Sequence, residues 1–390
     1  VRNLSPEINK QVDVMSSMML TASRCSSRIG PLVSLGRLPA IRQVSSQAER
    51  SSKQHAQPFW RQWRSSSGKS LGALVPIAGA VFAANRIHAS RASSSTCEDV
   101  KTTTPSELNV ALLQLKVSSD KEANWKTAVD AIRQAVKNGA EFVVLPEIWN
   151  GPYATKSFPE YCEPIPAVGD SPSKELHPTL YQIAEEAKAL KVPIVAGSIS
   201  EKGPNGQVFN TCVVLSSDGK CLARHRKVHL FDIDIPGKMT FKESETLTGG
   251  SELTTVPVPV GSKSVTIGIG ICYDVRFPEL SLSMKNRGAQ ILVFPGAFNT
   301  TTGPMHWSLL MRARAVDTQC IVLACSPSRN PDGYPAYGHS MAVDPRGNIL
   351  AEAGHEPEIV MAKLPLSDVF EVRSQIPVGY QRRHDVYAKL

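Results

Sequence analysis

The sequence is poor in cysteine, with eight in 390 residues and no CxxC pair. So few cysteines exclude the disulfide framework of a small secreted protein, and reduced thiols in an intracellular compartment are expected. Long apolar runs are also lacking. The run 71–84 contains Pro76 and two glycines, and it is well short of the roughly 20 residues that a membrane-spanning helix needs. No stable membrane span is therefore expected, the alternative being a membrane or sorting element at 71–84.

Acidic residues are scarce near the N-terminus. Residues 1–104 hold 14 Lys/Arg and 5 Asp/Glu, whereas residues 105–390 hold 29 and 30, so the net charges are +9 and −1. A nucleic-acid-binding protein carries its positive charge on the folded domain. Nucleic acid is therefore not expected as a partner.

Residues 1–104 have the composition of a targeting leader. Between Met18 and Thr96 there are eleven basic residues and one acidic residue, Glu49, and serines cluster at 65–67 and 93–95. Such Arg- and Ser-rich, acid-poor segments are typical of mitochondrial or chloroplast transit peptides. We expect a disordered or cleaved organellar leader, with a mitochondrial destination favoured over a chloroplast one. A cytoplasmic protein with a disordered tail is the alternative.

From Pro105 onward the pattern changes to alternating strands and helices. Strands are predicted at 109–117, 142–145, 194–198, 211–216, 221–227, 265–271, 291–294, 321–325, 339–343 and 359–364, and helices at 122–138, 178–190, 277–287 and 305–318. This order indicates a mixed α/β layered domain. No internal repeat or linker divides residues 105–390, so a single domain is predicted.

Three chemically reactive side chains lie at predicted strand ends: Glu147, Lys227 and Cys272. A partly buried carboxylate at a strand end has a pKa raised toward that of a general base. A lysine there can stabilise an oxyanion or keep a neighbouring thiol ionised, and the turn after a strand can expose a nucleophile to backbone N–H groups. Taken singly, each residue is more often structural: a solvated Glu, a solvated Lys or a buried core Cys.

Taken together, these segments resemble the nitrilase superfamily of carbon–nitrogen hydrolases. The motifs that carry the resemblance are LPE at 145–147, HRKVHLF at 225–231 and CYDVRFPEL at 272–280, in that order. The resemblance extends from about residue 108 to residue 387, which is nearly the whole predicted domain. It implies the four-layer α-β-β-α sandwich of that superfamily, as a single catalytic domain.

The resemblance also implies a role for each residue of the catalytic unit. Glu147 corresponds to the general base, Lys227 to the residue that stabilises the tetrahedral intermediate, and Cys272 to the nucleophile. Glu243 matches the second glutamate of the superfamily, which positions the lysine or the substrate. In this reaction the lysine favours the thiolate, the intermediate is a Cys thioester, and no metal or organic cofactor is required.

The flanking segments resemble the omega-amidase branch, which releases ammonia from monoamides of dicarboxylic acids such as 2-oxoglutaramate, 2-oxosuccinamate and succinamate. These segments are 146–150, 230–238, 294–299, 302–307, 373–378 and 382–387. FPEL at 277–280 departs from this branch and is closer to the sister branch that acts on deaminated glutathione. The alternatives are therefore a deaminated-glutathione amidase or another amidase of the superfamily and, more remotely, a non-catalytic binding protein with the same fold.

Further residues are expected to support catalysis or to bind substrate. Arg276 lies four residues after Cys272, and a guanidinium can bind the free carboxylate of such a substrate with two hydrogen bonds. The structural alternative is a pair between Arg276 and Asp274 or Glu279. Tyr273 is expected to lie beside the backbone N–H that holds the oxyanion, and Phe298 to line the substrate site. The resemblance implies a homodimer or a larger homo-oligomer.

Two other motifs do not support a metal or a nucleotide. His225 and His229 are four residues apart and follow Cys221, but in a predicted strand residues i and i+4 are too distant to share a metal ion. The GIG segment at 268–270 lacks the third glycine of a dinucleotide-binding motif.

Overall fold

The computed structural model describes residues 104–237, 239–330 and 333–387. The expected leader, except for its last residue, and the apolar run 71–84 lie outside the described residues. Among the described residues, no helix is long and apolar enough to cross a membrane.

One six-stranded sheet, in the order β14-β1-β2-β3-β4-β5, contains most of the N-terminal half of the domain. Its strands are β1 (Glu107–Gln114), β2 (Phe142–Val144), β3 (Ile194–Lys202), β4 (Val208–Leu215), β5 (Cys221–Arg226) and β14 (Glu358–Pro365). β1, β2 and β3 are parallel, and β4, β5 and β14 join them in antiparallel pairs. This sheet places β2 and β5 in the same direction, so the residues that follow them emerge at the same edge.

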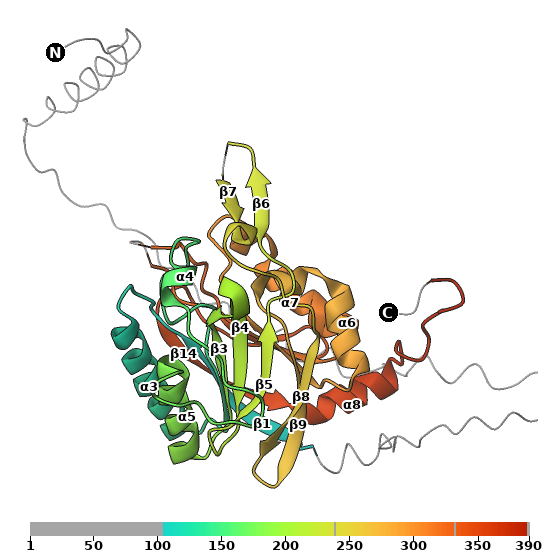
Figure 1. Cartoon of the computed structure of the whole chain (residues 1–390). Helices are drawn as coiled ribbons and strands as arrows, with labels where there is room; N and C mark the ends of the chain where they lie inside the picture. Colours follow the sequence, from blue (N-terminus) through green and yellow to red (C-terminus); the bar gives the residue numbers. More distant parts are fainter. Residues whose placement is uncertain (1–103, 238, 331–332, 388–390) are drawn as a thin grey trace, which may run out of the picture. The chain divides into compact units, whose positions relative to one another are not determined.

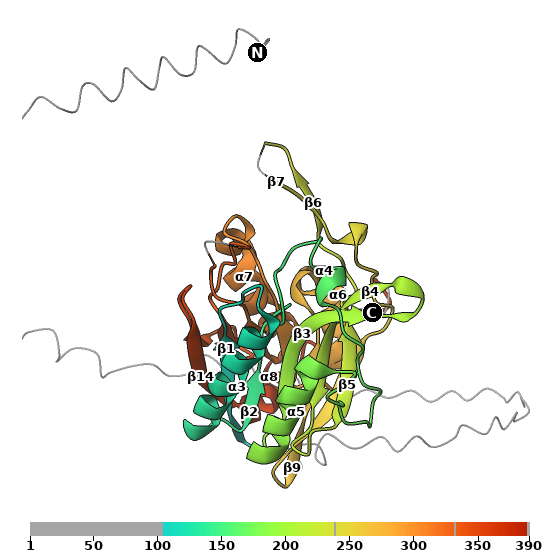
Figure 2. The same ribbon diagram turned by 60° about the vertical axis from the view of Figure 1, so that its left-hand side comes forward.

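A second six-stranded sheet has the order β13-β12-β11-β10-β9-β8. Its strands are β8 (Thr254–Val260), β9 (Lys263–Ile269), β10 (Ile291–Pro295), β11 (Ile321–Cys325), β12 (Met341–Val343) and β13 (Ile349–Glu352). A separate hairpin of β6 (Asp232–Ile235) and β7 (Met239–Lys242) projects from the domain (Figures 1 and 2).

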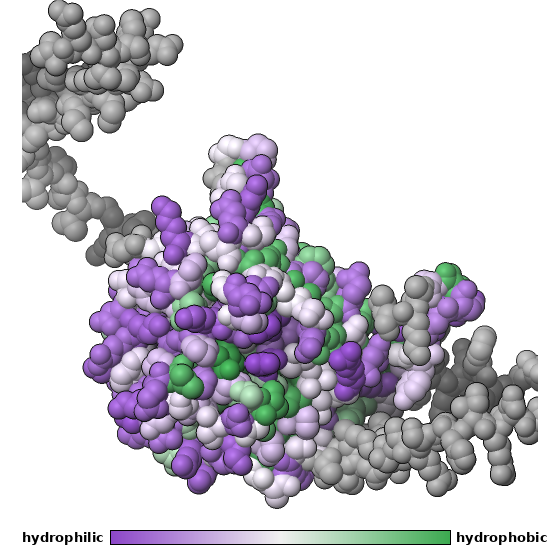
Figure 3. All heavy atoms as spheres, in the orientation of Figure 1, coloured by the Kyte–Doolittle hydropathy of each residue, from purple (hydrophilic) through white to green (hydrophobic). Residues whose placement is uncertain are grey.

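The side chains of β1 show how the layers pack. Leu108, Val110 and Leu112 point into a core shared with the second sheet, whereas Ala111 and Leu113 point into a core shared with helices. From Val110 to Leu113 both faces of the strand are buried, which explains why these four residues form a continuous apolar run instead of an alternating one. Figure 3 shows that the visible surface is largely hydrophilic, with apolar side chains only in small areas.

Helices cover the outer faces of the two sheets. α3 (Lys121–Lys137) and α5 (Pro178–Leu190) pack on the first sheet, and α6 (Pro278–Asn286) and α7 (Thr302–Thr318) pack on the second. The short helix α4 (Phe158–Tyr161) lies between β2 and α5 in the chain, and α8 (Leu366–Gln375) follows β14. The predicted α-β-β-α sandwich is confirmed.

The sequence-based boundary of α7 was wrong. The prediction began this helix at Met305, after Pro304, but it begins at Thr302. The Asn299 side chain accepts hydrogen bonds from the backbone N–H groups of Thr301 and Thr302, at 2.9 and 2.8 Å. Pro304 is tolerated because the first turn of a helix needs no N–H donor at that position.

Other predicted boundaries were also wrong. β1 ends at Gln114 instead of residue 117, and β12 begins at Met341 instead of residue 339 because His339 adopts a left-handed backbone conformation, with φ 58°. The sequence analysis missed β6, β7, β8, β13, α4 and α8. Most of these elements are short or partly exposed, and such elements leave only a weak periodic pattern.

Candidate active site

Three chain segments bring the reactive side chains together. Glu147 follows β2, Lys227 directly follows β5, and Cys272 lies just beyond β9 at the start of the short 3-10 helix η4 (Cys272–Arg276). The glutamate and lysine side chains have no exposed surface, and Cys272 is 3% exposed. The structure therefore encloses all three predicted residues in one buried cluster.

Lys227 lies between two carboxylates. Its Nζ is 3.0 Å from Glu147 Oε1 and 2.9 Å from Glu243 Oε1. Burial alone would lower the pKa of Lys227, but the negative charges of Glu147 and Glu243 outweigh burial and raise it well above the usual value. The lysine therefore carries a fixed positive charge in the cluster.

Glu243 is buried at the start of a 3-10 turn, η3 (Glu243–Glu245), which follows β7. Its Oε1 accepts a hydrogen bond of 2.7 Å from the Tyr153 hydroxyl, and its Oε2 accepts one of 2.7 Å from the Phe231 backbone N–H. Both oxygens of this buried carboxylate thus have hydrogen-bond partners, as buried polar groups require. Glu243 is thus held rigidly beside Lys227.

The two oxygens of Glu147 have different partners. Oε1 accepts a hydrogen bond from Asn210 Nδ2 at 2.8 Å and another from Lys227 Nζ, whereas Oε2 accepts one from the Ala297 backbone N–H at 2.7 Å. Burial raises the pKa of Glu147, although the nearby lysine charge opposes the rise. The raised pKa makes this carboxylate a stronger proton acceptor than an exposed glutamate.

Gly197 allows β3 to pack against the segment that carries Glu147. Its φ is 58°, and a Cβ atom there would lie 2.1 Å from the Pro146 carbonyl oxygen. The Ser198 backbone N–H donates to that same oxygen at 3.1 Å. Only glycine fits this close approach, which positions the end of β2.

Cys272 adopts an uncommon backbone conformation, with φ 48°. Gly296 packs against it, since a Cβ atom at position 296 would lie 3.2 Å from Cys272 Cα. Burial raises the pKa of the Cys272 thiol well above its usual value, and the Glu147 charge adds to this effect while Lys227 opposes it. Burial is therefore the largest influence on the ionisation of this thiol.

Lys227 and burial act on the thiol in opposite directions. The Lys227 charge lowers the pKa of Cys272, in the direction expected from the sequence, but this charge also pairs with Glu147 and Glu243, and burial outweighs it. Glu147 lies close enough for its charge to act on the thiol.

The sequence analysis missed Asn210 and Asp274. Asn210 lies on β4, opposite Lys227, whose backbone N–H donates to the Asn210 carbonyl at 2.8 Å. The sequence carries no local signal for Asn210, because its contact with Glu147 depends on strand pairing. Asp274 offered a signal, since it lies in the 272–280 motif only two residues after Cys272.

His225 and His229 both contact Asp274, with His225 Nε2 3.3 Å from Oδ2 and His229 Nδ1 2.7 Å from Oδ1. Within the described part of the chain, no group of three His, Cys, Asp or Glu side chains is arranged to hold a metal ion. The two histidines therefore serve a hydrogen-bonded cluster with an aspartate.

Arg276 is half-buried and lies among aromatic side chains. Its Cζ is 4.9 Å from the ring centre of Phe298 and 5.5 Å from that of Tyr273, and its Nη1 is 3.2 Å from His306 Nδ1. Among the described residues, no carboxylate pairs with this guanidinium. The alternative of a pair with Asp274 or Glu279 is wrong, and the structure brings Tyr273, Arg276 and Phe298 together.

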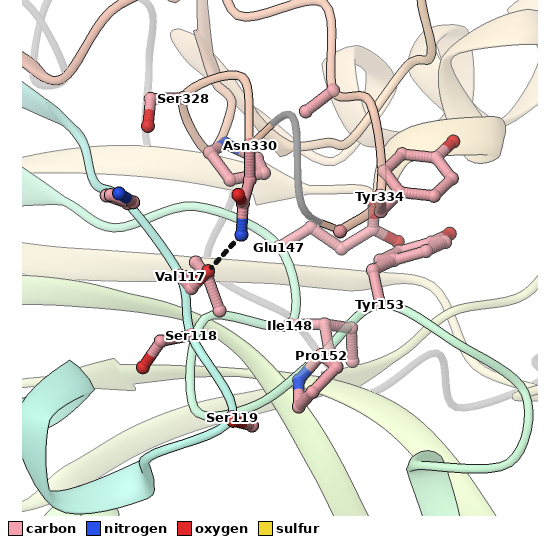
Figure 4. A pocket seen from close by; sticks show the side chains of 14 residues that line it. Val117, Ser118, Ser119, Glu147, Ile148, Pro152, Tyr153, Ser328, Asn330 and Tyr334 are labelled. Carbon is pink, nitrogen blue, oxygen red and sulfur yellow. Dashed lines mark hydrogen bonds between the residues drawn. The ribbon is translucent and has the colours of Figure 1, made fainter.

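A cavity of about 380 Å³ reaches Glu147 (Figure 4). Tyr153 and Tyr334 form part of its wall beside Glu147, with their ring centres 4.6 Å apart. The remaining lining mixes apolar residues such as Val117, Ile148 and Pro152 with polar ones such as Ser118, Ser328 and Asn330. Glu147 thus lies next to a space that small molecules can enter.

Comparisons with known proteins agree with this geometry. The carbon-nitrogen hydrolase family profile matches residues 109–374. The chloroplastic omega-amidase of Arabidopsis thaliana is 49% identical over 282 residues, which cover 72% of this chain and 74% of that protein. Omega-amidase NIT2 of Homo sapiens is 48% identical over 280 residues, covering 72% and 96%. The crystal structure of Saccharomyces cerevisiae Nit3, a member of branch 10 of the nitrilase superfamily, is 42% identical, with a TM-score of 0.64 and coverage of 71% and 97%.

Proposed function

The chain belongs to the carbon-nitrogen hydrolase family and is an amidohydrolase, and we propose that it is an omega-amidase that releases ammonia from monoamides of dicarboxylic acids. Substrates of this class include 2-oxoglutaramate, 2-oxosuccinamate and succinamate. The observation that carries the proposal is the buried ammonium of Lys227 between Glu147 and Glu243, at 3.0 and 2.9 Å, beside the Cys272 thiol. The names of the similar proteins support the same substrate class.

The first half of the proposed reaction forms a thioester. Glu147 takes the thiol proton as the Cys272 sulfur attacks the amide carbon. Negative charge develops on the amide oxygen, where the Lys227 ammonium and a backbone N–H beside Tyr273 stabilise it. Glu147 then gives its proton to the departing nitrogen, so that ammonia leaves and the acyl group stays on sulfur.

The second half of the reaction releases the acid. Glu147 removes a proton from water as the water oxygen attacks the thioester carbon, and the Cys272 sulfur recovers a proton when it leaves. The products are the dicarboxylic acid and ammonia, and the enzyme returns to its resting state. Every proton moves through side chains of the chain itself, so no step requires a cofactor.

Arg276 is the proposed binding residue for the carboxylate at the far end of the substrate. Its guanidinium is half-buried, lies over Phe298 and beside Tyr273, and pairs with no carboxylate among the described residues. Burial lowers the pKa of Arg276, yet a guanidinium stays charged in proteins. A partly desolvated cation of this kind favours an anionic ligand.

We propose that the protein is a homodimer. Met305, Leu309 and Val316 are exposed apolar side chains on α7, and their spacing places them on one face of the helix. A second copy of the chain would cover this face. Sedimentation equilibrium tests the proposal, because Leu309→Glu should shift the protein toward monomer.

Residues 1–104 are the proposed organellar leader, and a mitochondrial destination is favoured over a chloroplast one. The composition of this segment supports the proposal, and one similar plant protein is named chloroplastic. Microscopy of a fluorescent fusion tests it: a mitochondrial signal that is lost without residues 1–103 is expected. A cytoplasmic signal from the full chain would contradict it.

Ammonia release tests the proposed activity. We expect the protein to release ammonia from succinamate and Cys272→Ala to abolish this release. Parallel assays on deaminated glutathione, a ureido acid and a nitrile distinguish the alternative substrates. A protein that hydrolyses none of these compounds would instead be a non-catalytic binding protein.

A further inference from the structure

Asp274 closes the turn that contains Cys272. Its Oδ2 accepts a hydrogen bond of 2.9 Å from the Ile271 backbone N–H, and its own backbone N–H donates to the Ile271 carbonyl at 3.0 Å. Between them lies Cys272, whose φ of 48° is uncommon for a residue with a side chain. The two hydrogen bonds therefore stabilise the conformation that places the thiol.

The same carboxylate binds the segment that carries Lys227. Asp274 Oδ1 accepts from the His229 backbone N–H at 2.9 Å and lies 2.7 Å from His229 Nδ1, and Oδ2 lies 3.3 Å from His225 Nε2. His225 precedes Lys227 by two residues and His229 follows it by two residues. One buried side chain thus connects both flanks of the lysine to the turn of the nucleophile.

The surroundings of the two histidine rings fix their donor atoms. An ionised carboxylate only accepts hydrogen bonds, so His225 Nε2 and His229 Nδ1 both donate to Asp274. His225 Nδ1 faces the Thr254 hydroxyl at 3.1 Å, and the His229 ring stacks on Phe277 at 3.6 Å between ring centres. Although burial alone would raise the pKa of Asp274, the two histidine hydrogen bonds hold it below the usual value.

We propose that Asp274 is a positioning residue that sets the place of the Lys227 ammonium relative to the Cys272 sulfur through His225 and His229. This inference rests on the roles assigned to Lys227 and Cys272 in the proposed function. Asp274 itself does not touch the reacting atoms. Its loss should therefore affect the rate of the chemical step more than substrate binding.

Asp274→Asn tests the proposal, because the variant side chain keeps its shape but exchanges one acceptor oxygen for a donor. Asp344→Asn is the matched control. Asp344 is also buried and accepts hydrogen bonds from the Arg346 and Asn348 backbone N–H groups, at 2.8 and 2.9 Å, but it lies in the turn between β12 and β13. Both variants should lose thermal stability.

Only Asp274→Asn should lose catalysis. A misplacement of reacting groups by about 1 Å costs roughly 100-fold in rate, so we expect kcat on succinamate to fall by about that factor with little change in KM. Alkylation of Cys272 by iodoacetamide, followed by mass spectrometry, should slow in parallel. Asp344→Asn should retain the kcat and the alkylation rate of the unmodified protein.

Histidine variants provide an independent test that does not require Asp274→Asn to fold. The Gln amide can donate from the position of His Nε2, and the Asn amide from the position of His Nδ1. We expect His225→Gln and His229→Asn to retain most of the activity, whereas His225→Leu and His229→Leu should lose it. Conservative rescue of this kind distinguishes positioning from general packing.

Two results would overturn the proposal. One is an equal change of kcat and alkylation rate in Asp274→Asn and Asp344→Asn, and the other is equal impairment of His225→Gln and His225→Leu. If the unmodified protein releases no ammonia from succinamate, the proposed function fails. The alkylation rates of Cys272 then decide the positioning role by themselves, because they require no substrate.

Discussion

The side-chain amide of Asn210 donates a hydrogen bond of 2.8 Å to Oε1 of Glu147. The ammonium of Lys227 lies 3.0 Å from the same oxygen, whereas Oε2 accepts from the Ala297 backbone N–H. Oε1 is therefore occupied by two donors, and Oε2 is the oxygen that we expect to receive the thiol proton. The two oxygens of the proposed general base therefore have different hydrogen-bond partners.

Asn210→Ala should move the acidic limb of the pH profile to higher pH. The proposed reaction needs ionised Glu147, so activity is lost as the pH falls through the pKa of Glu147, which burial already raises. Loss of a donor to the carboxylate raises this pKa further, because the ionised form loses a hydrogen bond. Profiles of kcat/KM against pH measure the change. Asn124→Ala is the control, because Asn124 is also a buried asparagine but lies on α3. An unmoved acidic limb would contradict the prediction.

Glu147→Gln should lower kcat far more than Glu243→Gln. Both variants remove one negative charge next to Lys227, but only the first removes the general base, whose contribution is typically about 10²–10⁴-fold. We expect a loss of about 1,000-fold for Glu147→Gln and a clearly smaller loss for Glu243→Gln. Steady-state ammonia release measures both. Equal losses would show that Glu147 is not distinguished as the base.

Arg276→Ala should weaken catalysis on succinamate by roughly 2–4 kcal/mol in kcat/KM, because a charge-assisted pair in a closed site is lost. The effect on butyramide, which has no carboxylate, should be far smaller. His306→Ala is a suitable control, since it removes the 3.2 Å neighbour of Arg276 and leaves the cation. Equal losses on both amides, or a thermal destabilisation that accounts for both, would make Arg276 a structural residue.

Cys272 should be the residue that becomes acylated. Mass spectrometry of enzyme quenched during turnover, or treated with limiting iodoacetamide, is expected to find the adduct there. Burial raises the pKa of Cys212 and Cys325, and neither has an adjacent base in the proposed mechanism. Glu147→Gln should slow the labelling of Cys272. Preferential labelling of Cys162, Cys212 or Cys325 with activity retained would refute the assignment.

A protein that begins at Thr104 should fold and hydrolyse succinamate at the rate of the full chain. Thr104 is buried and accepts a hydrogen bond of 2.7 Å from the Gln290 side chain. A protein that begins at Ser106 loses this contact, so its thermal midpoint should be lower while kcat stays the same. Loss of soluble, active enzyme in the Thr104 variant would place the domain boundary further upstream.

Elements with a strong local pattern were predicted well from the sequence. The bounds of α5 and β11 agree with the structure, because the helix has apolar residues at helical spacing and the strand is a short apolar run. β8 was missed because prolines occupy alternate positions in it, and β13 because it is only four residues long and largely exposed. The FPEL segment at 277–280 contains the start of a helix. Pro278 occupies the first position of α6, where the missing N–H of proline costs nothing.

The sequence by itself determined the layered α/β class and the order of the motifs that carry Glu147, Lys227 and Cys272. These features depend on local periodicity and on residue type at strand ends, which neighbouring residues along the chain decide. Only the tertiary structure decided which atoms meet. Asn210 reaches Glu147 because β4 pairs with β3 and β3 pairs with β2, and Asp274 reaches His225 across 49 residues of sequence. The raised pKa of the Cys272 thiol likewise depends on burial and on charges from distant segments, and burial is a property of the packed layers.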